Sequence, residues 1–127
     1  MKPICEVMVL DILPGVRALV ARKLVEDHGF SQKIAAEKLG TTQPAISQYK
    51  RELRGHKVKI FKKNPKLLEM IDSLSERTAK GELSPEQTTL EFCKICEYTR
   101  KSGIVCEIHR KMYPSLANCN ICMEIKC

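Results

Sequence analysis

The sequence predicts an all-α protein: a helix-turn-helix head, connecting helices and a metal-stapled, cysteine-rich C-terminal module. Three observations support this fold class. Apolar residues recur at helical spacing between capping and stop residues, and the residue pairs that normally close a β-hairpin are missing. Six of the seven cysteines lie between Cys93 and Cys127. We therefore expect residues 1–63 to form the head and residues 64–127 to form the connecting helices and the cysteine module.

The first predicted helix begins near Pro14, because proline suits the first helical turn, and ends at about His28, before Gly29. A second helix should run from the N-cap Ser31 to Leu39, with Gly40 as its stop. The buried positions expected in these two helices are Val16, Leu19, Val20, Leu24, Ile34, Ala35 and Leu39.

A third helix should start at Gln43 and Pro44, with Thr42 as its cap, and continue to Arg54. Its inward residues are expected to be Ile46, Tyr49 and Leu53. We interpret residues 56–63 as a linker rather than a strand, because no hairpin turn accompanies their alternating pattern.

A fourth helix is predicted over residues 64–80, with Pro65 in its first turn and a stop at Gly81. A fifth should begin at Ser84, whose spacing from Gln87 is that of a capping box, and end before Gly103. The fourth helix carries an apolar stripe that could fill the core or form a dimer contact: Leu67, Leu68, Ile71 and Leu74.

The charge of the chain is uneven. The formal net charge is +7, but residues 1–66 contain 14 Lys and Arg against 6 Asp and Glu, whereas residues 67–127 contain 8 against 9. A polyanion such as DNA would therefore be attracted to the first half, although a soluble basic face would have the same composition. No apolar run is long enough to cross a membrane and no signal peptide is evident, so we expect a cytoplasmic protein.

The spacing between Ser31 and Ser47 is typical of a tight pair of helices. Ala36 is small enough for close approach, Gly40 can adopt a left-handed turn, and Ile46 can fill the shared core. Each residue is common by itself, so the prediction depends on their combination. A helix pair with no DNA function is the alternative.

On these residues, Pro14 to Arg54 resembles the helix-turn-helix of lambda-repressor-like (XRE-type) regulators. The resemblance implies a head that binds double-stranded DNA, with the start of the recognition helix in the major groove. It implies base contacts by Gln43 above all, with a bracing role for Gln32 and backbone contacts from the basic residues. The DNA-binding residues expected are Gln32, Thr42, Gln43, Pro44, Ser47, Gln48, Lys50, Arg51 and Arg54.

The cysteine tail contains two CxxC pairs, Cys93 with Cys96 and Cys119 with Cys122, and a CxxH between them that begins at Cys106. Two thiolates at this spacing can face one ion or cluster, so these five cysteines are the predicted metal ligands. We assign no ligand role to His109, to Cys127 or to the isolated Cys5.

The sequence leaves the metal open between zinc and an iron–sulfur cluster. Zinc could take the two CxxC pairs, which would leave Cys106 without a role, whereas a cluster could use Cys106 with three of the others. The whole chain also resembles small predicted archaeal transcriptional regulators, and an anaerobic archaeal source would favour a 4Fe–4S cluster.

These expectations together describe a homodimeric DNA-binding regulator, not an enzyme, whose 4Fe–4S cluster senses redox, iron or cluster status. The dimer is inferred because one head covers few base pairs. The first alternative is a constitutive zinc-stapled DNA-binding or adaptor protein. The second is a thiol oxidoreductase, although a redox CxxC normally accompanies a βαβ unit that this sequence lacks.

Overall fold

The computed structural model describes residues 2–52 and 58–124, apart from the side chains of residues 49–58. Every regular element in these ranges is a helix, and no strand occurs in them, so the all-α prediction is confirmed for this part of the chain. The elements are α1 (Ile4–Val7), η1 (Met8–Ile12), α2 (Leu13–Glu26), α3 (Gln32–Leu39), α4 (Gln43–Glu52), α5 (Val58–Lys62), α6 (Pro65–Ala79), α7 (Pro85–Lys101), α8 (Ile104–Met112), η2 (Pro114–Leu116) and α9 (Ile121–Glu124).

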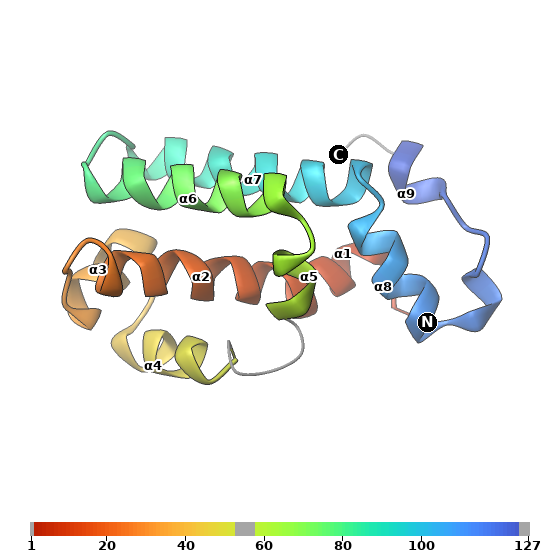
Figure 1. Cartoon of the computed structure of the whole chain (residues 1–127), viewed down its shortest axis with the longest axis horizontal. Helices are drawn as coiled ribbons and strands as arrows, with labels where there is room; N and C mark the ends of the chain where they lie inside the picture. The colour runs from red at the N-terminus through yellow and green to blue at the C-terminus, as the bar shows by residue number, and fades with distance from the viewer. Residues whose placement is uncertain (1, 53–57, 125–127) are drawn as a thin grey trace.

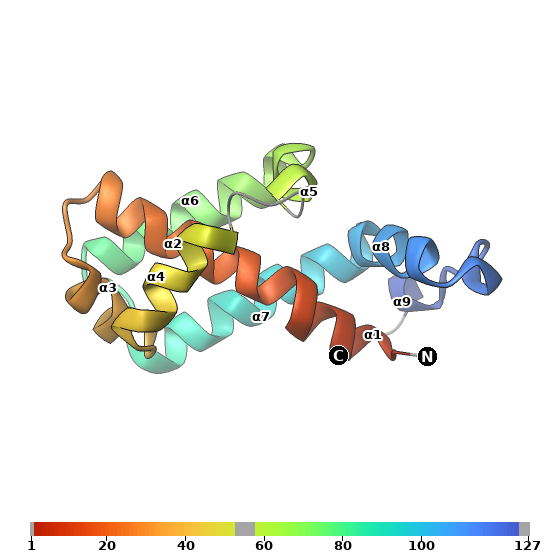
Figure 2. The same cartoon turned by 90° about the horizontal axis from the view of Figure 1, so that it is seen from below.

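The helices form two main layers (Figure 1). Helices α6 and α7 lie side by side as an antiparallel hairpin above α2, and α3 packs at one end of α2. Helix α4 lies on the side of α2 that faces away from the hairpin and is directed toward the viewer in Figure 2. Helices α8 and α9 occupy the opposite end of the molecule from α3.

The first helical segment begins earlier than the sequence suggested. Helical structure starts at Ile4 rather than near Pro14 and passes through the π-helical turn η1 before it enters α2. Pro14 lacks an N–H and crowds the preceding turn of the helix, and the π-helical turn η1 lies in that preceding turn. The extension places Val7, Met8 and Ile12 in the core.

The prediction of a linker over residues 56–63 is wrong for residues 58–62, which form α5. Phe61 on this helix is fully buried, and its ring packs directly on Gly15 of α2. A Cβ atom at Gly15 would lie 2.5 Å from Phe61 Cε2, so only glycine permits this approach. The alternating pattern of lysines did not indicate a helix, because α5 packs on α2 mainly through the single aromatic side chain of Phe61. Residues 56 and 57 lie outside the described ranges.

One hydrophobic core connects the two halves of the chain. Val16, Leu19 and Leu24 of α2 belong to the same buried cluster as the stripe of α6 and residues of α7 and α8. Leu67, Ile71 and Leu74 are fully buried in that cluster, so they stabilise the monomer and are not available as a dimer surface. The predicted division of the chain at residue 63 stays a prediction. One core contains residues from both sides of that position.

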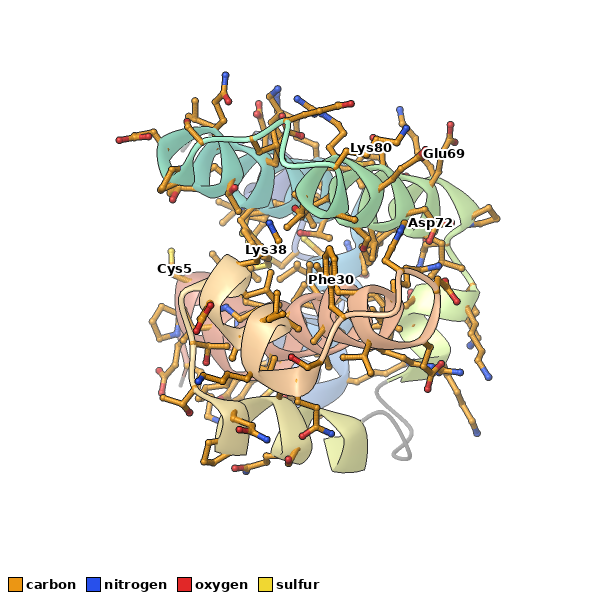
Figure 3. All side chains as sticks on the ribbon, turned by 90° about the vertical axis from the view of Figure 1, so that its left-hand side faces the viewer. Cys5, Phe30, Lys38, Glu69, Asp72 and Lys80 are labelled. Atoms are coloured by element: carbon orange, nitrogen blue, oxygen red, sulfur yellow. The ribbon has the colours of Figure 1, made fainter. Side chains whose placement is uncertain are left out.

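Polar contacts also connect the helices, both between the two layers and within the hairpin. Lys23 of α2 forms an ion pair with Asp72 of α6, and Arg77 of α6 pairs with Glu91 of α7 at 3.2 Å. Figure 3 shows Phe30 in the space between the layers, where the Lys38 ammonium lies 5.6 Å from the centre of its ring. The ion pair of Lys23 with Asp72 thus attaches α2 to the hairpin, and the contact of Lys38 with Phe30 holds α3 against the segment that precedes it.

Candidate nucleic-acid interface and cysteine cluster

Local caps fix the ends of the α3–α4 pair. The Ser31 hydroxyl accepts a hydrogen bond from the Ile34 amide at 3.2 Å, and the Thr42 hydroxyl accepts one from the Ala45 amide at 3.3 Å. Between the helices, Gly40 adopts a left-handed conformation with φ of 64°. The caps at Ser31 and Thr42 and the turn at Gly40 therefore lie where the sequence predicts them.

Small side chains allow α2, α3 and α4 to pack closely against one another. Ala36 of α3 is 4% exposed and packs with Ala21 and Ile46 in a separate buried cluster. Ala35 is also buried, on the side of α3 that contacts the main core. Ile34 is 45% exposed, so its predicted place in the core is wrong. Because α3 packs through two adjacent alanines, Ile34 lies on its outer side.

Gln32 and Ser47 connect the two helices. The Ser47 hydroxyl donates a hydrogen bond to Gln32 Oε1 at 3.1 Å, across fifteen positions of sequence. This bond fixes the start of α3 against the middle of α4. Because the Ser47 hydroxyl donates this bond within the protein, Ser47 helps to position α4 in addition to any contact that it makes with DNA.

The start of α4 presents an open polar surface. Gln43, Pro44 and Gln48 are exposed, and α4 lies on the outside of the molecule (Figure 2). Lys50 and Arg51 belong to α4, but their side chains are outside the description, and Arg54 lies outside the described residues. An α-helix with a free outer face and amide side chains near its N-terminus has the shape and chemistry needed to enter a DNA major groove.

The five predicted cysteine ligands occupy different environments. Cys106 on α8 is 3% exposed and Cys122 on α9 is 7% exposed. Cys96 and Cys119 are partly buried, and Cys93 is exposed on α7. Cys5 is exposed near the N-terminus.

Three of these thiols are neighbours. Burial raises the pKa of the Cys122 thiol to about 11, and the hydrogen-bonded Cys106 and the nearby Cys119 add to the rise. The buried Arg100 opposes it. Among residues 2–52 and 58–124, however, no three histidine, cysteine, aspartate or glutamate side chains are arranged to hold a metal ion. The raised pKa keeps the Cys122 thiol protonated near neutral pH, and the three thiols are not arranged as ligands aimed at one point.

Arg110 holds the turn that carries Cys119. Its Nε and Nη2 atoms donate to the Cys119 carbonyl at 3.0 and 2.7 Å, and Nη2 also bonds to the Asn120 side chain. The guanidinium can make all three bonds because its donors point in a fixed fork. Sequence reasoning missed this residue, since nothing in the local pattern connects Arg110 with a turn nine positions later.

His109 serves a different part of the chain. Its Nε2 atom lies 2.8 Å from the Lys2 carbonyl oxygen, and the Tyr113 hydroxyl accepts a hydrogen bond from the Lys2 amide at 2.7 Å. The two rings pack edge to face, with centroids 5.3 Å apart. These contacts attach the N-terminal segment to α8, a role that the CxxH spacing did not indicate.

No helix in the described ranges is long and apolar enough to span a membrane. Comparison of the chain with family models, with curated proteins and with solved structures gives no match.

Proposed function

We propose that the protein is a sequence-specific DNA-binding transcriptional regulator that reads the major groove with α4. The observation that carries this proposal is the construction of the α3–α4 pair. Its caps, its left-handed turn and the bond between Gln32 and Ser47 position one exposed helix whose first residues are amide-bearing or small. Gln43 is the first candidate for a base contact, because its side chain can pair with adenine through two hydrogen bonds.

Charge supports the same assignment. The excess of basic residues lies in the half of the sequence that contains α3 and α4. Lys50 and Arg51 follow the proposed reading residues on α4, and basic residues of a recognition helix commonly contact the phosphate backbone. We assign them, with Arg54, to phosphate contacts.

The DNA proposal is tested by selection from a pool of random duplexes with the full chain. The expected result is enrichment of one sequence, with a two-fold repeat if the active form is a homodimer. Recovery of duplexes with no shared sequence would contradict specific reading and would leave only a basic surface. A thermal unfolding control shows that the selected protein is folded.

We propose further that the cysteine region binds a 4Fe–4S cluster, with zinc as the alternative. The donor set supports this: thiolates are the ligands of both, and Cys106, Cys119 and Cys122 already lie together. A fourth ligand would come from Cys96 or Cys93 on α7. The described arrangement does not itself fit a four-ligand site, so we derive no step of DNA binding from the cluster.

Metal analysis of anaerobically purified protein separates the alternatives. Iron with sulfide would support the cluster, and one zinc per chain would support the structural staple. The Cys119→Ser, Cys122→Ser double variant should lose the metal and bind DNA more weakly while it retains helical circular dichroism. Full DNA affinity in the metal-free double variant would contradict a sensing role for these cysteines.

A further inference from the structure

A cavity of about 710 Å³ lies outside the α3–α4 pair and outside the thiol cluster. It opens where α5, α8 and the N-terminal segment meet, in the part of Figure 1 where α5 and α8 flank the beginning of the long N-terminal helix. Its size is within the range of sites that hold small organic molecules. Neither the proposed DNA contact nor the proposed metal site uses it.

Two helices give the cavity an apolar lining. Ile104 and Ile108 are four positions apart and so face the same side of α8, and Met112 continues that side. Ile60 contributes from α5. Met112 is 37% exposed, so part of its side chain is open to the solvent in the cavity. An apolar group in the cavity would cover this surface.

Lysines surround the apolar lining. Lys59 lies on α5, Lys63 lies in the turn directly after that helix, and Lys2 enters from the N-terminal segment. In the part of the chain that the structure describes, no carboxylate forms an ion pair with these three residues. The acidic Glu107 at the edge is paired with Lys111 at 3.3 Å, and Asp11 has a partner of its own.

The arrangement of these lysines is held in place. The hydrogen bonds of His109 and Tyr113 to the backbone of Lys2 attach its segment to α8. Phe61, buried against Gly15, attaches α5 to α2 and so holds the backbone that carries Lys59 and leads to Lys63. Because Lys59 and Lys63 line the same cavity, their like charges repel each other, and an anion between them would relieve that repulsion.

We propose that this cavity binds an amphipathic anion, namely a carboxylate that carries an aliphatic chain. The carboxylate pairs with Lys59, Lys63 and Lys2, and the chain lies on Ile60, Ile104, Ile108 and Met112. A fully polar anion such as inorganic phosphate would leave the apolar lining uncovered, and a neutral lipid would leave the lysines unpaired. This binding does not depend on the proposed DNA contact.

The test is calorimetric titration of the full chain with decanoate, decanol and decyltrimethylammonium, all below their micellar concentrations. The three probes share one chain length and differ in the charge of the head. The account predicts saturable binding of decanoate, weaker binding of decanol and none of decyltrimethylammonium. Equal binding of all three probes, or no binding of decanoate, would overturn the proposal.

Charge reversal locates the site. Lys59→Glu together with Lys63→Glu should weaken decanoate binding about tenfold or more, because two of the three cations become anions. Lys62→Glu is the matched control, since Lys62 is exposed on the same helix but does not line the cavity. If Lys62→Glu weakens decanoate binding as much as the double variant, the carboxylate is not held at this cavity. Circular dichroism of each variant confirms that the helices are retained.

Discussion

The α3–α4 pair and the α8–α9 region are both short helical pieces at the ends of the molecule, but they are built differently. The pair is fixed by hydroxyl caps, a glycine turn and alanines that let helices approach closely. The α8–α9 region instead depends on one arginine that bonds to a turn and on the buried Cys122 thiol beside Cys106. The ends of the α3–α4 pair are set by cap and turn signals a few positions apart, whereas no such local signal marks the contacts of the α8–α9 region.

This difference has a functional consequence. The α3–α4 pair presents a rigid polar surface, as a recognition element needs. The α8–α9 region has a short element, four-residue α9, and the buried Cys122 thiol beside Cys106, so its stability should respond to pH, oxidation and metal. The predictions below test each side of this comparison.

The largest effect is expected for Ala36→Leu, which forces three carbon atoms into the contact between α3, α4 and α2. Overpacking of this kind costs about 1–3 kcal/mol in the free energy of unfolding, measured by urea denaturation. DNA affinity should fall with it, because α4 loses its position. Lys33→Leu is the control, since Lys33 is exposed on the same helix. Unchanged stability and DNA binding in Ala36→Leu would mean that this contact does not position α4.

Arg110→Ala should loosen the other region. Loss of its bonds to the Cys119 carbonyl should raise amide hydrogen exchange of residues 119–124 about tenfold, which corresponds to about 1.4 kcal/mol. Exchange in α3 and α4 should not change. Lys111→Ala, which removes only an exposed ion pair, is the matched control. A uniform change along the whole chain would show that the two regions do not open independently.

Lys50→Ala and Arg51→Ala should each weaken binding to all DNA sequences alike. Each lost phosphate contact reduces the slope of log affinity against log salt by about 0.9. Lys101→Ala on α7, remote from α4, should leave the slope unchanged. Wild-type salt dependence in the Lys50 and Arg51 variants would remove both residues from the DNA backbone.

The next prediction concerns stability at alkaline pH. The pKa of Cys122 rises from 9.0 to about 11 in the folded protein, so the folded state holds a proton that the unfolded chain releases first. This contribution is complete below about pH 9 and is lost as the pH rises toward 11. The metal-free, reduced protein should therefore lose stability over that window, and Cys122→Ala should lose less. Parallel pH curves for the two proteins would show that the thiol is not buried.

The sequence predicted the parts of the fold that local signals determine. Ser31, Gly40, Thr42 and the capping box of Ser84 with Gln87 lie where expected, because a cap involves residues only three positions apart. The helices α6 and α7 follow from the same kind of signal.

The features that the sequence did not predict share one cause, because each depends on a tertiary contact. Helix α5 is stabilised by the packing of Phe61 on Gly15, which lies more than forty residues earlier. The periodicity of apolar residues within a segment cannot predict such a contact. Ile34 is exposed because α3 packs on its neighbours through Ala35 and Ala36. In the candidate site, the bond of Arg110 to the Cys119 carbonyl and the cavity of Lys59 and Lys63 depend on the assembled fold. The base-reading and metal-binding assignments stay predictions.

The most direct test of DNA reading by α4 compares Gln43→Ala with the wild-type chain on the selected duplex and on random duplex of equal length. Gln43 is exposed at the start of α4, so its replacement should leave the thermal unfolding midpoint unchanged. The account predicts that affinity for the selected duplex falls by about 1–3 kcal/mol while affinity for random duplex stays the same. Equal affinity of both proteins for the selected duplex would contradict the assignment of α4 as the helix that reads DNA.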